Sequence, residues 1–287
     1  MSVELVLHGR PRSLEIPLAR VLPAATRRMV GPFIFLDHMG PAEVPPGEGL
    51  AVRPHPHVGL ATVTWLFEGA IFHRDSLGNQ QLIRPGELNW MTAGRGIVHS
   101  ERSPADGAGG TLHGLQMWVA LPAEHEDTAP TFTHYPTLPA VDRPGARLHI
   151  IAGTAYGATA PTEALSPLFY VEARLQPGAQ LPMVEGYTER ALYIVDGDVV
   201  VDGTTYPRET MLIFAPGEPA VVESVGPALV MLLGGEPVGR RYIDWNFVAT
   251  SPERIEAAKA AWRAFGTPEG ARFPFVPGDE GEFIPLP

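Results

Sequence analysis

The sequence predicts an all-β protein made of two antiparallel β-barrels and one short C-terminal helix. The 287 residues include 31 glycines and 31 prolines, whereas average usage would give about 35 of the two together. Charged residues are few, at 18%, and short apolar runs alternate with turn signals, which is typical of hairpins. The Pro-Gly-Glu turn at residues 85–87 recurs at residues 216–218, which indicates a duplicated unit.

The domain boundaries are predicted from composition. A proline-punctuated and partly acidic stretch at residues 122–145 is expected to separate the two barrels. Residues 1–135 would then form the first barrel and residues 136–250 the second. Residues 251–287 are expected to form a helix and an extended tail that packs on the barrels.

The first barrel is expected to begin with strands in residues 1–30, where apolar and polar residues alternate. Residues 31–38 then form a buried strand that ends in Asp37 and His38. These two side chains either orient a ligand histidine or a substrate, or they form a hydrogen-bonded corner. Residues 40–49 are rich in proline and glycine and are expected to form a loop.

Two short segments of the first barrel carry the residues of a candidate metal site. His55 and His57 lie two residues apart, and so do His99 and Glu101. Side chains two residues apart on a strand share one face of the sheet, so both pairs can converge if their strands face each other inside a small barrel. Three imidazoles and one carboxylate suit a first-row metal such as Fe(II), Mn(II), Ni(II) or Cu(II), and they leave room for exogenous ligands.

The alternative is that the paired histidines fill a polar seam and that Glu101 is merely solvated. A lone His-x-His pair would favour that interpretation, but the second pair and the glycine-rich residues 94–96 favour a metal site. The chain has no cysteine, so there is no thiolate set, which argues against structural zinc. His73 follows a Glu-Gly turn and is interpreted as a surface or hairpin-edge histidine.

Side chains on the neighbouring segments are candidates for the pocket around the metal. Residues 112–121 are expected to form a strand with Gln116 and Trp118 on one face, so Gln116 could reach the pocket as a hydrogen-bond partner. Bulky apolar side chains either line a pocket for a flat aromatic molecule or form the barrel core, and they are Phe33, Phe35, Trp65, Phe67, Trp90 and Met91. Of these, Trp90 is the candidate pocket residue.

The second barrel differs from the first in its histidines. Asp-Gly signals at residues 196–197 and 202–203 predict hairpins there. All ten histidines lie at or before His149, so the second barrel cannot build an imidazole site. It is expected to be structural or to form an interaction surface. The helix that follows it is expected to begin after the N-cap Ser251 and to end at Gly266.

Charge and composition exclude several classes of function. The formal net charge is −11 and Lys259 is the only lysine, so binding to nucleic acid or to an anionic membrane through a basic patch is not expected. The absence of cysteine rules out a disulfide framework. The N-terminus lacks a signal-peptide pattern, and the longest apolar stretch, residues 224–235, is too short to span a bilayer. A soluble cytoplasmic protein is therefore expected.

The histidine segments resemble the paired cupin motifs and, in detail, the pirin family. The resemblance covers essentially the whole chain, and its stretches are residues 35–41, 55–57, 89–101, 114–119 and 276–285. It implies a bicupin with one mononuclear iron in the N-terminal barrel, and the family's ligands fall on His55, His57, His99 and Glu101. One departure is that Ala61 and Thr62 stand where cupins, and many pirins, have a glutamate.

The resemblance to pirins implies two functions of different kinds. Several pirins resemble quercetinases, which open the central ring of a flavonol. The chain is accordingly expected to use Fe(II), O2 and a small aromatic hydroxy compound, with Mn, Ni, Co, Cu and Zn as other candidate metals. Glu101 would be the catalytic base. Other pirins resemble metal-dependent interaction modules that co-regulate transcription or a metabolic enzyme, and that role would require a protein partner. A metal-free storage-like bicupin is disfavoured because all four ligands are present.

Overall fold

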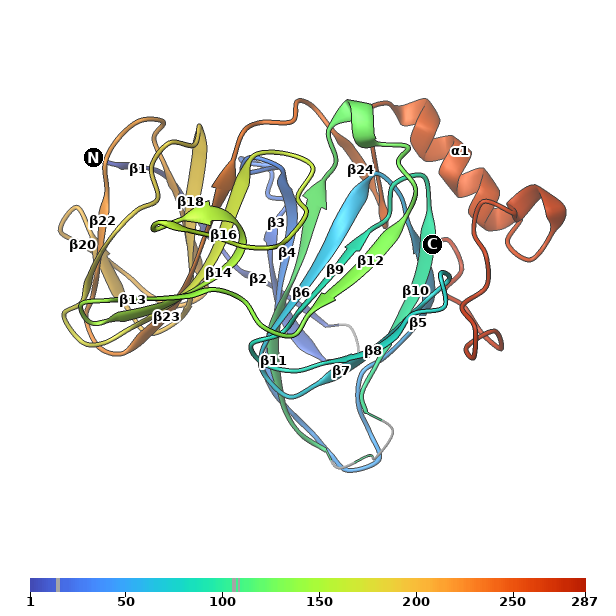
Figure 1. Ribbon diagram of the computed structural model, residues 1–287, viewed down its shortest axis with the longest axis horizontal. Coiled ribbons are helices and arrows are strands. Elements are labelled where there is room, and N and C mark those ends of the chain that lie inside the picture. Colours follow the sequence, from blue (N-terminus) through green and yellow to red (C-terminus); the bar gives the residue numbers. More distant parts are fainter. Residues whose placement is uncertain (14–15, 105–106, 108) are drawn as a thin grey trace. The chain divides into compact units, whose positions relative to one another are not determined.

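The computed structural model describes residues 1–13, 16–104, 107 and 109–287 (Figure 1). Antiparallel strands dominate the fold, which confirms the all-β prediction. The chain divides into two compact units. Unit 1 consists of Met1–Arg12, Ala19–His38 and Thr137–Val238, and unit 2 consists of Ser13–Leu18, Met39–Pro136 and Gly239–Pro287. Three strands contribute residues to both units, and they are β2 (Arg10–Ser13), β3 (Pro17–Leu22) and β4 (Phe33–Val44).

Unit 1 contains two antiparallel sheets around one apolar core. The larger sheet has the order β1-β21-β18-β23-β16-β14-β13, with β15 paired to β14. Its strands are β1 (Val3–His8), β13 (Ala140–Arg143), β14 (Ala146–Ala155), β15 (Ala158–Thr159), β16 (Leu168–Leu175), β18 (Glu189–Asp196), β21 (Thr210–Phe214) and β23 (Ala228–Gly235). The smaller sheet has the order β17-β22-β19-β20, with β17 (Gln180–Pro182), β19 (Val199–Val201), β20 (Thr204–Tyr206) and β22 (Val221–Ser224). Buried Leu192 of the larger sheet and Val222 of the smaller one belong to one apolar cluster.

The two Asp-Gly signals of unit 1 have different outcomes. Asp202 and Gly203, at φ 50° and 76°, turn β19 into β20, as expected for a two-residue hairpin. Asp196 and Gly197 instead connect β18 to β19, which lie in different sheets. The signal at Asp196 and Gly197 therefore marks a connection between two sheets and not a hairpin, because β18 pairs with β21 and β23.

The N-terminal strand and residues 239–250 each belong to a different unit from the one that their position in the sequence suggested. Strand β1 pairs with β21, so the N-terminus belongs to the unit built mainly from residues 137–238. Residues 239–250, which were expected in the second barrel, belong to unit 2. Local patterns mark such segments as strands, but the sheet that a strand joins depends on partners far away in the sequence.

Unit 2 contains two sheets that face a common core (Figure 1). One sheet has the order β5-β10-β7-β8, and in the other the neighbours β12-β9-β6-β11 are followed by β4, β3 and β2. The strands are β5 (Ala51–His57), β6 (Leu60–Glu68), β7 (Ile71–Asp75), β8 (Gln80–Ile83), β9 (Leu88–Thr92), β10 (Ile97–Arg102), β11 (Gly110–Ala120) and β12 (Thr131–Tyr135). Leu66 on β6 and Ile71 on β7 are buried in one cluster, so side chains of both sheets fill one interior.

The segment that was expected to be a loop at residues 40–49 is partly a strand, because β4 continues to Val44. Gly40 permits this continuation. It has φ 71°, and a Cβ atom there would lie 2.2 Å from the carbonyl oxygen of Leu112. Only glycine accepts both the positive φ and this close approach of another backbone.

The C-terminal part of unit 2 contains the helix α1 (Pro252–Arg263), the 3-10 helix η2 (Pro268–Gly270) and a tail without regular structure. Ser251 caps α1 as predicted, since its side chain accepts a hydrogen bond from the backbone N–H of Arg254. Buried Trp262 packs in one cluster with Phe247 of the hairpin β24 (Tyr242–Asp244) and β25 (Phe247–Ala249). None of the helices among the described residues is both long and apolar enough to cross a membrane.

The tail lies against the two strands that carry the paired histidines. The backbone N–H of Ile284 donates to the carbonyl of Pro54 in β5 at 2.8 Å. Arg102 of β10 forms ion pairs with Asp279 and Glu282 of the tail, both at 2.8 Å. The tail therefore supports β5 and β10 within unit 2.

Candidate metal centre

The pairing of β5 with β10 brings three histidines together. His55 lies directly opposite His99, and His57 lies opposite Ile97. Directly paired residues of antiparallel strands share one face of the sheet, so all three imidazoles point to the same side. Their ring centroids are 4.4 to 5.0 Å apart. One ring nitrogen from each of the three histidines lies within 4.8 Å of the other two.

Backbone carbonyls fix the orientation of two of the three rings. Nδ1 of His55 lies 2.9 Å from the carbonyl oxygen of Arg53, and Nδ1 of His57 lies 3.1 Å from that of Asn246. A carbonyl oxygen can only accept, so each Nδ1 carries the proton and each Nε2 keeps its lone pair. Asn246 lies between β24 and β25, so a segment that was expected in the other barrel orients one of the candidate ligands.

The third ring, that of His99, has a buried nitrogen whose lone pair is available to a ligand. Among the described residues, Nε2 of His99 has no hydrogen-bond partner although it is shielded from solvent. A buried polar atom without a partner costs free energy, and a bound cation would satisfy it. Three neutral imidazole nitrogens are ligands that first-row metals accept, so these residues fit a mononuclear metal.

Burial keeps the three imidazoles neutral. It lowers the pKa of His55 to about 4, and it lowers the pKa values of His57 and His99 well below the usual range. Proximity of the rings acts in the same direction, because each protonated imidazole disfavours a second one. Metals bind the deprotonated nitrogen, so the site is ready for a metal at neutral pH.

Acid is expected to destabilise the metal-free protein through these histidines. The folded state holds the pKa of His55 at about 4, whereas the unfolded chain has about 6.5. Below pH 6.5 the unfolded chain therefore binds a proton that the folded state refuses, so between pH 7.5 and pH 5 the free energy of unfolding falls by about 2 kcal/mol through His55 alone. Urea unfolding of the metal-free protein at both pH values measures this loss. The variant His55→Asn should show the smaller pH dependence, and an equal slope in both proteins would contradict the buried neutral state.

Glu101 lies beside the histidine group rather than within it. It is not one of the residues whose donor atoms lie within 4.8 Å of one another. Burial raises its pKa, while the proximity of His73 and a hydrogen bond with the Thr64 side chain lower it. The hydroxyl of Thr64 also lies 2.9 Å from Oε1 of Gln116. Coordination by Glu101 stays a prediction.

The strand β11 carries Gln116 and Trp118 on one face, as the alternation of the sequence predicts. Gln116 pairs with Thr64 and Trp118 pairs with Thr62, so both side chains are on the face that carries Thr64. The ring of Trp118 lies edge-on to His57, with centroids 5.1 Å apart at 75°. Gln116 and Trp118 therefore lie on the face of the β12-β9-β6-β11 sheet that is turned toward the three histidines.

The prediction of Trp90 as a pocket residue is wrong. In the pairing of β6 with β9, Trp90 lies opposite Val63 and Asn89 lies opposite Thr64. Because directly paired residues share a face, Asn89 is on the site side and Trp90 is on the other side. The alternation of β9 was clear from the sequence, but its phase relative to β6 was not.

Asp37 and His38 have the contacts of the hydrogen-bonded corner. Asp37 accepts two hydrogen bonds from the guanidinium of Arg20, at 2.8 and 2.7 Å. Nδ1 of His38 lies 2.9 Å from the hydroxyl of Tyr193. All four residues belong to unit 1, whereas the histidine group belongs to unit 2. The structure therefore supports the alternative in which these two side chains are structural.

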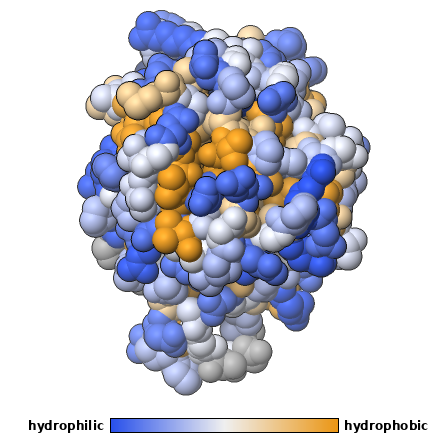
Figure 2. Space-filling model, turned by 90° about the vertical axis from the view of Figure 1, so that its left-hand side faces the viewer, coloured by the Kyte–Doolittle hydropathy of each residue, from blue (hydrophilic) through white to orange (hydrophobic). Residues whose placement is uncertain are grey.

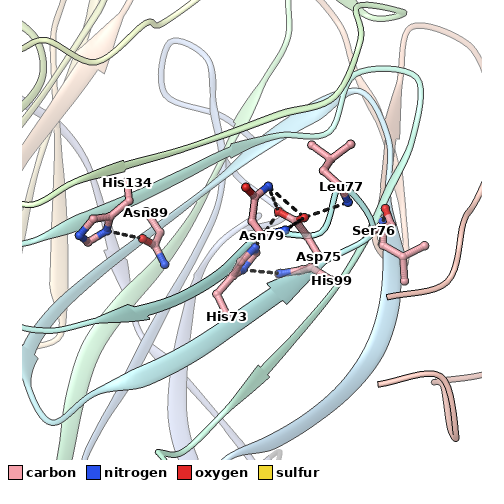
Figure 3. Close-up of polar contacts among 9 residues, drawn as sticks. His73, Asp75, Ser76, Leu77, Asn79, Asn89, His99 and His134 are labelled. Carbon is pink, nitrogen blue, oxygen red and sulfur yellow. Dashed lines mark hydrogen bonds and ion pairs between the residues drawn. The ribbon is translucent and has the colours of Figure 1, made fainter. Parts of the chain in front are cut away.

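His73 is the residue that sequence reasoning missed. It was interpreted as a surface histidine, but only 4% of it is exposed, and its Nδ1 lies 3.4 Å from Nδ1 of His99 (Figure 3). Its ring stacks on Phe132, with centroids 4.4 Å apart. Burial would raise the pKa of Asp75, but hydrogen bonds from His73 and Asn79 outweigh it and hold the carboxylate ionised. The His-x-Asp spacing of His73 and Asp75 was the signal that could have revealed a second inward-facing pair.

Sequence comparisons show which protein family and which relatives the chain matches. The family description "Pirin" matches residues 15–119, and "Pirin C-terminal cupin domain" matches residues 170–268. A pirin-like protein of Caulobacter vibrioides is 49% identical over 292 residues, which covers 99% of this chain and 99% of that protein. A protein of Pseudomonas aeruginosa, named as a candidate quercetin 2,3-dioxygenase, is 40% identical over 276 residues, with 95% of this chain and 85% of that protein covered.

Solved structures agree with these matches. The crystal structure of quercetin 2,3-dioxygenase from Acinetobacter baumannii superposes with a TM-score of 0.91 at 33% identity, and it covers 99% of this chain and 94% of that one. The bacterial pirin YhhW of Escherichia coli, solved in complex with nickel(II), has a TM-score of 0.66 at 17% identity, covers 81% of this chain and 99% of that one, and supports the fold alone. The fold is a bicupin, and the chain belongs to the pirin family.

Proposed function

We propose that this protein is a mononuclear metal-dependent dioxygenase of the quercetinase type, with Fe(II) as its metal. The observation that carries the proposal is the convergence of His55, His57 and His99 in one barrel, with each Nε2 free for a metal. The relatives named for quercetin 2,3-dioxygenase activity support the substrate class. When bound, the metal would supply Lewis-acid polarisation of the substrate and redox chemistry with O2.

Glu101 is the residue best placed to take the proton of the substrate's hydroxyl. A general base must be near the reacting proton and have a pKa that approaches the working pH. Burial raises the pKa of Glu101, and its place outside the histidine group leaves its basicity less reduced than that of a metal-bound carboxylate. Contact with Thr64, itself bonded to Gln116, holds the carboxyl group in position.

The inner face next to the histidines suits a flat aromatic substrate. Trp118 lies at the edge of His57, and Met91, paired with Thr62, is buried on the same face. Apolar side chains exclude water and stack on aromatic rings, whereas Thr64 and Gln116 can form hydrogen bonds with hydroxyl groups. A flavonol, or a similar aromatic compound with adjacent oxygen substituents, matches this combination.

Oxygen uptake tests the proposed activity. The metal-free protein is loaded with Fe(II) under anaerobic conditions and then mixed with quercetin and O2. We expect O2 consumption together with loss of the flavonol, and neither in a sample from which the metal has been removed by a chelator. Bound iron without any O2 consumption would contradict the dioxygenase proposal.

The alternative function is a metal-dependent protein-interaction module. Figure 2 shows a mostly hydrophilic face on which apolar residues gather near the middle, and the chain has exposed large apolar side chains such as Val221 and Val225, at 48% and 57% exposure. Exposed apolar surface is a feature of interaction sites. The oxygen-uptake experiment separates the two functions, since an interaction module would bind metal without consuming O2.

A further inference from the structure

A buried row of hydrogen bonds leads from the candidate metal centre into the barrel wall. Nδ1 of His99 lies 3.4 Å from Nδ1 of His73, and Nε2 of His73 lies 3.1 Å from Oδ2 of Asp75 (Figure 3). All three side chains are buried, and Asp75 has no exposed surface at all. The register explains the arrangement, because His99 lies opposite Asp75 and Glu101 lies opposite His73. We call these three residues the His99–His73–Asp75 triad.

The two carboxylate oxygens of Asp75 have different partners. Oδ1 accepts hydrogen bonds from the backbone N–H groups of Leu77 and Asn79, at 2.9 and 3.1 Å. Oδ2 faces His73, and the side-chain amide of Asn79 lies near both oxygens, at 3.0 and 2.9 Å. Oδ1 therefore stabilises the turn between β7 and β8, and Oδ2 is directed to His73.

These contacts leave one arrangement of protons that suits a metal. A carboxylate only accepts, so Nε2 of His73 carries a proton, and in the neutral ring Nδ1 then keeps a lone pair. That lone pair accepts the proton on Nδ1 of His99, and the lone pair of His99 is then on Nε2. This is the nitrogen that is buried without a partner.

We propose that His73 and Asp75 are positioning residues that select the metal-binding tautomer of His99 and fix the orientation of its ring. This inference rests on the proposed metal site. Neither residue belongs to the group that could hold the metal, and both act through Nδ1 of His99. Partners of this kind fix the tautomer of a ligating histidine and contribute about 10- to 100-fold to metal affinity.

The substitution Asp75→Asn tests the tautomer directly. The amide oxygen can take the place of Oδ1 and keep the two backbone hydrogen bonds of the turn, while the amide nitrogen takes the place of Oδ2. The amide then donates to Nε2 of His73 and moves the proton of that ring to Nδ1. The proton of His99 is consequently driven onto Nε2, where it blocks the metal. We expect a 10- to 100-fold weaker affinity for Fe(II) or Ni(II) in a chelator competition.

A double-mutant cycle separates this role from a purely structural one. Without the imidazole of His73, the proton on Nδ1 of His99 no longer depends on residue 75. In the His73→Ala background, Asp75→Asn should therefore change the affinity by less than about twofold. A cost that is as large in that background as in the wild type would show that Asp75 acts only through the turn, and it would overturn the proposal.

The matched control is His134→Gln, which removes an imidazole from the same barrel that is half-buried and lies outside the triad. His134 contacts Asn89 at 2.9 Å and is separate from the triad (Figure 3). Its metal affinity should equal that of the wild type. A loss as large as that of Asp75→Asn would show that any missing imidazole in this barrel weakens metal binding, which would contradict a specific role of the triad.

Nitrogen NMR on the metal-free protein gives a second readout. Chemical shifts of 15N-labelled imidazoles distinguish a protonated Nδ1 from a protonated Nε2. We expect His99 to carry its proton on Nδ1 in the wild type and on Nε2 in Asp75→Asn. An unchanged tautomer would refute the proposal whether or not the protein consumes O2. Correct tautomers together with no O2 consumption would refute the dioxygenase function and leave the triad standing.

Discussion

Replacing His99 by alanine is expected to abolish metal binding and leave the fold largely intact. The substitution removes the imidazole that lies between His55 and His73, together with the Nε2 lone pair that is buried without another partner. Structural zinc sites have an apparent binding free energy on the order of 10–16 kcal/mol, shared among four ligands, so a single ligand contributes on the order of a few kcal/mol. The affinity should therefore fall by more than about 100-fold. Metal analysis of the purified variant and a chelator competition measure the loss.

The variant His57→Ala should lose metal to a similar extent, since its Nε2 belongs to the same group. The control is His125→Ala, which changes a histidine in the 3-10 helix η1 (Ala123–His125) and should keep the metal. Circular dichroism checks that all three variants retain the β-sheet fold. Full iron content in His99→Ala would remove His99 from the ligand set.

The three candidate ligand histidines could be picked out from the sequence because their arrangement is local. Two residues that are two positions apart on a regular strand share a face, so the pairs His55–His57 and His99–Glu101 were visible without a structure, although the pairing with β5 shifts its register between His99 and Glu101. The helix α1 was predictable for the same reason, since Ser251 caps its start and Gly266 follows three residues after its last residue, Arg263. Turn chemistry and strand parity are properties of a few neighbouring residues.

The rest of the site depends on which strands lie side by side. His73 faces inward only because β7 pairs with β10 and places it opposite Glu101. Trp90 faces away only because β9 pairs with β6 in a register that puts Asn89 opposite Thr64. The carbonyl that orients His57 comes from Asn246, which is 189 residues further along the chain. Such pairings are set by long-range packing, for which a single sequence carries no local signal.

Replacing Glu101 by glutamine is expected to remove turnover and leave metal binding within about tenfold of the wild type. Glutamine has the shape of glutamate and can keep the contact with Thr64, but it cannot accept the hydroxyl proton of the substrate. General bases contribute about 10²- to 10⁴-fold to a rate, so O2 consumption with quercetin should fall by that factor. Because the base must be ionised and burial raises the pKa of Glu101, the wild-type rate should also decline on acidification, starting at a higher pH than for an ordinary glutamate.

The control for this variant is Glu68→Gln, at the exposed end of β6 in the same barrel, which should retain the wild-type rate and pH profile. Comparison of metal content with turnover then decides between the two roles of Glu101. Loss of both metal and turnover would make Glu101 a ligand that the metal draws into the histidine group, as the family resemblance implies. Retained metal with lost turnover would make it the base, and unchanged turnover would exclude it from the chemistry, because no proton acceptor would remain at that position.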